Sequence, residues 1–417
     1  MLGRSGISYG PRGYSTPRSG VFAGRPRSLL SRAFAPNSTL RHMDWLLILV
    51  VLGLSALGIL LVWSATQPSL LAQGLDPRTY LKKQLLNVAL GLLLMFAVTL
   101  VESRRLRSWA MACYGVTLLA LLVVLTPIGS DINGAHAWIS LPGGFQIEPS
   151  EFAKIALISV TAMIFSQRGG ARPGIKACLL ALACAAPLLG LVVIEPALGV
   201  AMVLVAVLAA MIVLSGMRLR IIFGLTAIVA AVIFTAGGLH LLKPYQTRRF
   251  TSFLHPAANL TGAGYNAAQA KIAVGSGGMF GQGLFHGQLV AGNFVPAQQT
   301  DFIFTVAGEE LGFVGAIVIV FLLGVVIVRA LRIAARADDQ FGTLVAVGVA
   351  VWFAVQSFVN IGMTIGIMPI TGLPLPFLSY GGSAVFADMI AIGMLQSVHR
   401  RHGVFGGLGV FGNGQRP

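Results

Sequence analysis

The sequence has few charged residues: only 10% of its 417 residues are Asp, Glu, Lys or Arg, whereas 56% are hydrophobic. A soluble protein of this length needs more charge to cover its surface, so the composition indicates an integral membrane protein. Acidic residues are the scarcer sign, at 13 against 29 Lys and Arg, which leaves a net charge of +16. The positions of the basic residues, given below, favour a membrane over nucleic acid as their partner.

Cysteine is also rare, and all three cysteines (Cys113, Cys178 and Cys184) lie inside apolar runs. They provide no disulfide framework, and we interpret them as small core residues. The histidines match no metal-ligand spacing, so the sequence predicts no histidine metal site. No internal repeat is visible, which disfavours an inverted-repeat transporter.

Residues 1–43 differ from the rest of the chain because they are rich in Gly, Ser, Pro and Arg and have no hydrophobic periodicity. This composition predicts a disordered basic tail held at an anionic inner leaflet. No signal-peptide cleavage pattern follows it, so we expect the first apolar segment to be a retained span.

The sequence after residue 43 predicts an all-α integral membrane protein with about ten transmembrane helices. Most basic residues fall in the tail and in alternate loops, which places both termini in the cytoplasm. Residues 401–417 are expected to form a short cytoplasmic tail, and 240–301 one large extracytoplasmic loop. The expected spans lie near 45–65, 84–101, 109–126, 152–166, 177–194, 198–215, 220–239, 302–328, 342–368 and 382–398.

Two acids, Glu151 and Glu195, lie near the outer ends of expected spans and are candidate functional residues. Glu151 and Lys154, in "EPSEFAK", lie three residues apart and share one helix face. They form either a self-neutralising pair that lets the helix be buried, or a site in which Lys154 faces a groove for an anionic headgroup. Glu195, in the short turn "IEPALG", fits a solvated turn residue better than a catalyst.

The large outer loop carries three cations, Arg248, Arg249 and Lys271. The planar guanidinium group suits phosphate oxygens, so these residues are candidate ligands of a diphosphate headgroup. Anchoring at the membrane interface is the alternative.

Three acids, Asp301, Glu309 and Glu310, enter the eighth expected span together without a basic neighbour in sequence. They require partners from elsewhere, for which Arg248 and Arg249 are candidates.

Further along, Pro369, Pro374 and Pro376 exclude a continuous helix, and such broken backbone at membrane depth must be buried in protein or line a cavity. Asp388, in the last expected span, has no partner nearby in sequence.

Together, the motifs "EPSEFAK", "GAGYN", "TDFIFTVAGEELGF" and "PLPFLSYGGSA" resemble the SEDS family (shape, elongation, division and sporulation), over residues 44–400 and in the family's order. The segments "IAVGSGG" and "GLFHG" are more similar to its elongation branch. The resemblance implies a peptidoglycan glycosyltransferase that polymerises lipid II, an undecaprenyl-diphosphate-linked disaccharide peptide, at the outer face of the bacterial plasma membrane. Its implied partners are a class B penicillin-binding protein transpeptidase and membrane proteins of the elongation complex, and no nucleic acid. A divalent cation, Mg²⁺ or Mn²⁺, is an implied cofactor.

Residue by residue, Glu151 and Lys154 match the family's P-S-E-x-x-K segment, and Lys83 matches its basic-Gln entry to the second span. We take these three, with Arg248, Arg249 and Lys271, as the candidate substrate-binding residues.

Three positions depart from the family. Asn259, in "HPAANLTGAGYN", stands where the family has the Asp assigned as general base. Ala197 replaces the acid of P-D-L-G, and Ala137 replaces an Arg before the Trp of the first outer loop. An amide cannot accept the proton that a carboxylate accepts. The substitutes that face outside are Glu195, Asp301 and Glu148.

The sequence leaves three functions open. The first is a lipid II polymerase. The second is a catalytically impaired paralogue that binds lipid II or recruits a penicillin-binding protein, and it is favoured by Asn259, Ala197 and Ala137. The third is a lipid flippase, which is disfavoured because the polar clusters gather on the outer side.

Overall fold

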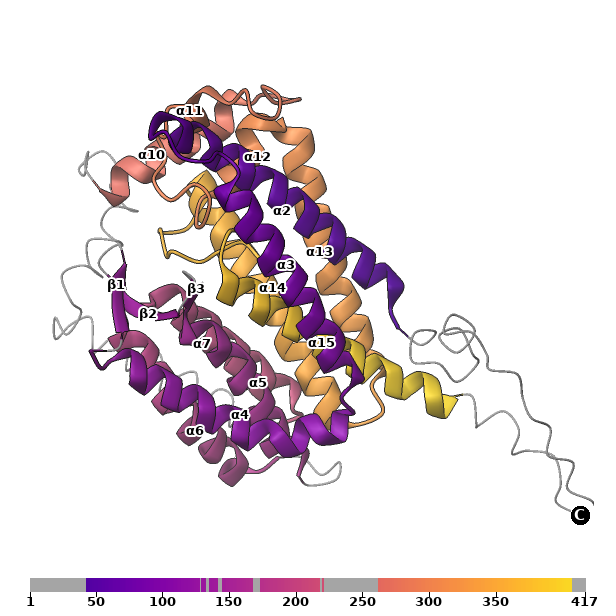
Figure 1. Cartoon of the computed structure of the whole chain (residues 1–417). Coiled ribbons are helices and arrows are strands. Elements are labelled where there is room, and N and C mark those ends of the chain that lie inside the picture. Colours follow the sequence, from indigo (N-terminus) through magenta and orange to yellow (C-terminus); the bar gives the residue numbers. More distant parts are fainter. Residues whose placement is uncertain are drawn as a thin grey trace, which may run out of the picture. The chain divides into compact units, whose positions relative to one another are not determined.

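The computed structural model describes residues 43–127, 129–132, 135–141, 145–167, 173–217, 220 and 262–406. Long helices that run alongside one another make up most of this part of the chain (Figure 1). The expected all-α membrane architecture is therefore confirmed. The predicted disordered tail and almost all of the predicted span 220–239 lie outside the described residues.

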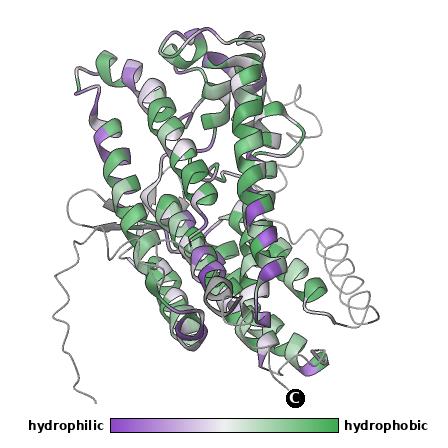
Figure 2. Ribbon diagram, turned by 90° about the vertical axis from the view of Figure 1, so that its right-hand side faces the viewer, coloured by the Kyte–Doolittle hydropathy of each residue, from purple (hydrophilic) through white to green (hydrophobic). Residues whose placement is uncertain are grey.

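Among the described residues, seven helices are long and apolar enough to cross a membrane, and hydrophobic residues follow their length (Figure 2). At a rise of about 1.5 Å per residue, their 18 to 28 residues match the thickness of a bilayer core. The seven are α2 (Trp45–Ala72), α3 (Thr79–Leu100), α4 (Ser103–Val124), α5 (Pro149–Ser166), α6 (Ile175–Ile194), α13 (Gly312–Arg336) and α14 (Gln340–Ile365).

Two further helices also correspond to expected spans, but one is shorter than the seven and the other carries polar residues. Helix α7 (Leu198–Leu214) has only 17 residues, and α15 (Gly382–Gly406) carries Asp388 and Gln396 among its apolar residues. Helix α15 continues beyond residue 400, so the predicted C-terminal tail begins six residues later than expected.

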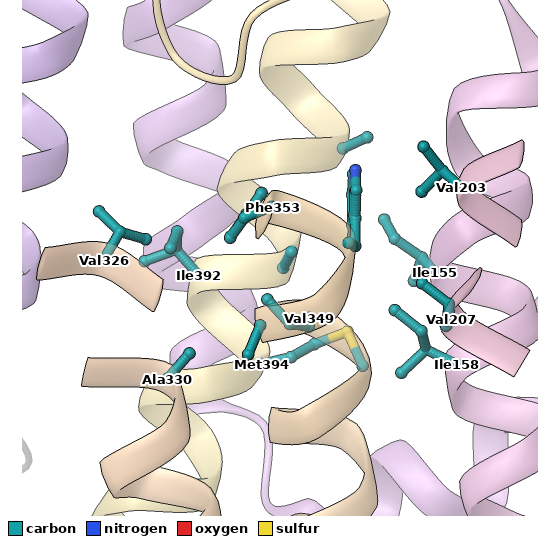
Figure 3. Packing of buried hydrophobic residues seen from close by; sticks show 14 of the residues in the cluster. Ile155, Ile158, Val203, Val207, Val326, Ala330, Val349, Phe353, Ile392 and Met394 are labelled. Carbon is teal, nitrogen blue, oxygen red and sulfur yellow. The ribbon is translucent and has the colours of Figure 1, made fainter. Parts of the chain in front are cut away.

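The core is organised around α5, which packs against α4, α6, α7, α14 and α15. Nearly every side chain of α5 is buried, and its alanines permit close approach of the neighbouring helices. Helix α15 packs along α3 on the other side of this core. Figure 3 shows the contact between α5, α7, α13, α14 and α15, made by Ile155, Ile158, Val203, Val207, Val326, Ala330, Val349, Phe353, Ile392 and Met394.

The expected span 302–328 is interrupted, which corrects the sequence prediction. Helix α12 (Ile303–Glu310) is separated from α13 by the single residue Leu311, and Gly312 adopts a φ of +68° at the break. A Cβ at Gly312 would lie 2.2 Å from the backbone nitrogen of Gly281, so only glycine fits this crossing. The loop that includes α11 (Gln288–Ala291) packs against this break, and we call residues 281–312 the helix junction.

The helix junction provides hydrogen-bond partners for two of the acids that the sequence left without a neighbour. Glu309 accepts hydrogen bonds from the backbone N–H groups of Leu289 at 2.7 Å and Val290 at 3.1 Å. Glu310 accepts from the Ser64 hydroxyl and from the Phe285 N–H. Backbone amides and a hydroxyl therefore stabilise these carboxylates, while the predicted partners Arg248 and Arg249 lie outside the described residues.

The proline-rich segment between α14 and α15 is non-helical, as predicted, and amide side chains of α14 satisfy its backbone. Gln356 donates to the Pro374 carbonyl at 2.8 Å, and Asn360 donates to the Leu373 carbonyl at 2.6 Å. Asp388, which lacked a partner in sequence, accepts from the Phe377 N–H of this segment. These bonds explain how irregular backbone persists inside the helical bundle.

A small antiparallel sheet occupies the loop 127–151, where the sequence predicted no strand. Its strands β1 (Gly129–Ile132), β2 (Ala135–Leu141) and β3 (Phe145–Ile147) lie in the order β1-β2-β3, with Ser130 opposite Trp138 and Ile139 opposite Ile147. Strand β3 leads through Glu148 directly into α5.

Candidate functional site

A cavity of about 440 Å³ lies where the sheet, the start of α3 and the α6–α7 turn meet the irregular segments 297–301 and 371–384. This volume is typical of a site for a small molecule or part of a larger ligand. The lining combines polar and aromatic side chains with small apolar residues. Its principal side chains are Tyr80, Lys83, Asn87, Trp138, Gln146, Glu148, Glu151, Glu195, Gln299, Thr300, Asp301, Thr371, Tyr380 and Ser383.

Five charged residues singled out from the sequence meet in this cavity, although they come from four separate parts of the chain: Lys83, Glu148, Glu151, Glu195 and Asp301. Lys271, on α10 (Ala263–Ser276), is exposed and lies over Gly366, and it is not part of the lining. Asn259, Arg248 and Arg249 lie outside the described residues, so their predicted roles stay predictions.

Glu151 and Lys154 form the predicted ion pair, with Nζ 2.8 Å from Oε2, and both side chains are buried. The Lys154 ammonium also donates to Gln356 Oε1 at 2.9 Å and lies 4.5 Å from the centre of the Trp352 ring. Because a buried charge is stable only when paired, these contacts explain why α5 can be enclosed. They hold the Lys154 charge inside the protein, while Glu151 borders the cavity.

Glu195 directly follows the last residue of α6, and Pro196 and Ala197 complete the short turn into α7. The sequence favoured a solvated turn residue, but Glu195 is only 1% exposed, which corrects that interpretation. Within the described part of the chain, neither carboxyl oxygen has a hydrogen-bond partner. Burial, with a smaller contribution from the Glu148 carboxylate, raises the pKa of Glu195 to about 8.

Glu148 precedes α5 and is tied to two neighbouring elements. Its backbone N–H donates to the Ser383 hydroxyl at 2.8 Å, and its carboxylate accepts from the Ser150 hydroxyl at 2.8 Å. Burial, followed by repulsion from the Glu151 carboxylate, raises the pKa of Glu148 to about 8. The cavity therefore holds several acids that disfavour one another's ionisation.

Backbone contacts fix the opposite wall of the cavity. The Tyr380 N–H donates to the Gln299 carbonyl at 2.8 Å, and Asn360 donates to the Asp301 carbonyl at 2.8 Å. The Tyr80 and Tyr380 rings meet edge to face with centroids 5.0 Å apart. Burial, with a smaller effect of Tyr80, raises the pKa of Tyr380 to about 12, so it stays a neutral hydrogen-bonding phenol.

Several lining residues were not identified from the sequence. Asn87 follows Lys83 by one helical turn on α3, and a second polar residue at that spacing was a usable signal. Tyr380 and Ser383 lie within "PLPFLSYGGSA", one of the motifs that carry the family resemblance, but neither was singled out as a site residue. Ala137 and Ala197, two of the three departures from the family pattern, line this same cavity.

Comparison with known proteins agrees with this architecture. Residues 44–403 match the Cell cycle protein family of FtsW, RodA and SpoVE. The chain is 38% identical over 361 residues to a protein of Trichlorobacter lovleyi named probable peptidoglycan glycosyltransferase FtsW, covering 86% of this chain and 93% of that one. It is 35% identical over 358 residues to peptidoglycan glycosyltransferase MrdB of Escherichia coli K12, covering 86% and 94%.

The fold also matches a solved structure. One chain of a peptidoglycan synthase complex, solved to show how polymerization and crosslinking are coordinated, superposes with a TM-score of 0.72 at 32% identity, covering 86% of this chain and 98% of that one. With the matching spans, motifs and fold, this chain belongs to the Cell cycle protein family of FtsW, RodA and SpoVE.

Proposed function

We propose that this protein is a peptidoglycan glycosyltransferase that polymerises lipid II at the outer face of the bacterial plasma membrane, for wall elongation and cell shape. The observation that carries the proposal is the cavity, which gathers Lys83, Glu195 and Asp301 with two tyrosines beside the helical bundle. Relatives of the chain that are similar over most of their length are named for this activity. The helices long and apolar enough to span a membrane also support a lipid-linked substrate.

The cavity's groups suit a sugar with many hydroxyls and a diphosphate leaving group. Asn87, Gln299 and Ser383 offer hydrogen-bond donors and acceptors to sugar hydroxyls, and the tyrosine rings offer apolar faces. Lys83, exposed at the start of α3, offers a positive charge to the diphosphate. Arg248, Arg249 and Lys271 remain predicted ligands of the same headgroup.

The implied divalent cation is not matched by a protein-built site in the described residues. These residues contain no group of three or more His, Cys, Asp or Glu side chains that could hold a metal ion. We propose that Mg²⁺ or Mn²⁺ enters bound to the diphosphate of lipid II, since Mg²⁺ commonly binds through substrate phosphates and retains water. No catalytic step is assigned to it.

We also propose that a class B penicillin-binding protein transpeptidase and other elongation-complex membrane proteins assemble with the chain. The support is the likeness to one chain of a peptidoglycan synthase complex, in which polymerization is coordinated with crosslinking.

A non-catalytic protein that binds lipid II or recruits a penicillin-binding protein is the second candidate. One observation favours it: Ala137 and Ala197 both line the cavity, so two charged groups of the family pattern are absent from one site. A lipid flippase is the third and less favoured candidate.

The test is reconstitution of the full chain with the class B penicillin-binding protein of the same organism and labelled lipid II. Glycan strands made by the wild-type protein support the polymerase. Strands made only by Asn259→Asp support the impaired paralogue, and their absence in both, with lipid II bound, supports a scaffold. Lipid II translocation in proteoliposomes without strands supports the flippase.

A further inference from the structure

Glu195 stands out among the acids of the cavity because nothing in the described structure occupies its carboxyl group. Glu151 is paired with Lys154, and Glu148 accepts from Ser150. Glu195 is as buried as Glu151, yet both of its oxygens lack partners within the described residues. Leaving a buried polar group unpaired costs about 1–3 kcal/mol, so this arrangement calls for an explanation beyond stability.

The position of Glu195 supplies that explanation. Glu195 lies at the end of α6, in the short turn that leads into α7, and it borders the cavity. The cavity is lined on the remaining sides by groups that bind hydroxyls, so a hydroxyl placed there would find Glu195 as the acceptor that has no other donor.

We propose that Glu195 is the proton acceptor for the attacking hydroxyl of the sugar acceptor, so that polymerisation does not require a carboxylate at position 259. This inference rests on the proposed function and assigns a catalytic residue to its site. Asp301 and Glu148, the other two substitutes that the sequence left open, then shape the electrostatics of the cavity.

In the proposed transfer step, the hydroxyl oxygen of the acceptor sugar forms a bond to the anomeric carbon of the donor, and its proton passes to the Glu195 carboxylate. The bond from that carbon to the diphosphate oxygen breaks, and the diphosphate leaves with the electron pair. The Glu195 carboxylic acid then loses its proton to water, which restores the base.

The surrounding charges decide when Glu195 can act. The Glu148 carboxylate approaches it from the residue before α5, and Asp301 and Glu151 line the same cavity together with Lys83. The charge of Glu151 is offset by its ion pair with Lys154, which lies behind the lining. Desolvation first and Glu148 second raise the pKa of Glu195 to about 8, which makes its ionised form a stronger base than an exposed glutamate. Because only that form accepts a proton, activity should rise with pH and level off above about 8.

The experiment measures lipid II polymerisation by the full chain, reconstituted with its penicillin-binding protein, between pH 5.5 and 9.5 (roughly the range in which a shifted carboxyl titrates). Glu195→Gln keeps the shape but cannot accept the proton, and it should lower the rate about 100-fold or more. Glu102→Gln is the matched control, because Glu102 is exposed beyond the far end of α3 and should retain the wild-type rate and pH profile. Binding of fluorescent lipid II by Glu195→Gln should stay within about threefold of wild type, since the lost contact acts mainly in the transition state.

A second variant tests the electrostatic coupling. Glu148→Gln removes the like charge facing Glu195, so the midpoint of the pH–rate profile should move to lower pH. A purely structural role for Glu195 does not predict this shift.

The outcomes separate the two proposals. A wild-type protein that makes no glycan overturns the proposed function and this inference with it. Wild-type activity with comparable activity and an unchanged pH profile in Glu195→Gln overturns the inference alone. Loss of lipid II binding or of thermal stability in Glu195→Gln, or an unmoved midpoint in Glu148→Gln, also overturns it.

Discussion

The cavity and the helix junction both bury carboxylates, but the hydrogen bonding of these carboxylates differs between the two regions. At the junction, Glu309 and Glu310 accept hydrogen bonds from backbone N–H groups of the loop that they anchor. In the cavity, Glu195 is equally buried and has no such partner in the described residues. Glu309 has both oxygens hydrogen-bonded and Glu310 has one, so these acids stabilise a crossing of two segments, whereas the open carboxyl group of Glu195 is available to a substrate. The four predictions that follow test this contrast.

The largest effect is expected from Lys154→Met, which converts Glu151 into a second unpaired acid. Removing one partner of a buried ion pair should lower the free energy of unfolding by about 3–5 kcal/mol. Thermal melting of the detergent-purified protein measures it, with Lys176→Met on the exposed start of α6 as the control. The double variant Glu151→Gln/Lys154→Met should recover much of the loss. A single variant as stable as wild type would contradict the assigned role of the pair.

Glu309→Gln should have the next largest effect. The amide keeps one acceptor oxygen for the two N–H groups of Leu289 and Val290, so we expect a loss of about 1–3 kcal/mol. Polymerisation by the surviving folded protein should be retained, because Glu309 does not line the cavity. Unchanged stability with lost activity would reverse the distinction between the two regions.

Unlike the two preceding variants, Glu195→Gln should not lower the free energy of unfolding. A raised pKa means that the folded state holds the proton more tightly than the unfolded state, whose value is near 4.5. The wild-type protein should therefore lose stability as pH rises from about 4.5 to about 8, and Glu195→Gln should show a smaller decline, since only the contribution of Glu148 remains in this cavity. Above pH 8 the variant should be as stable as wild type or more stable, by about 1 kcal/mol. Melting curves across this range test it, and a clear destabilisation of the variant would show that Glu195 has a structural partner.

Ala197→Asp should have the smallest effect. It adds a carboxylate to the cavity two residues after Glu195. Like-charge repulsion should raise the pKa of Glu195, so the midpoint of the pH–rate profile should move upward by about 0.5–1 unit. Ala197→Asn adds similar volume without charge and should leave the midpoint in place. Equal shifts in both variants would exclude an electrostatic effect.

The site could be predicted in part because some of its relations are local. Glu151 and Lys154 are neighbours on any helix, so their pairing followed from a spacing of three residues. Gly312 shows the limit of such reasoning: its apolar surroundings predicted an unbroken span, and only the close approach of Gly281 explains the break. The sheet at 129–147 was missed because two of its three strands have only three or four residues, too short to show an alternating pattern.

The sequence by itself determined the membrane class, most of the spans, the proline-broken segment and the family, because hydrophobic length, backbone chemistry and motif order are properties of the chain alone. The tertiary structure decided which polar groups meet. Lys83, Glu195, Asp301 and Ser383 come from four separate elements, and their common cavity exists only after those elements pack. Burial, which changed Glu195 from an expected solvated turn residue into an unpaired acid, depends on neighbours distant in sequence.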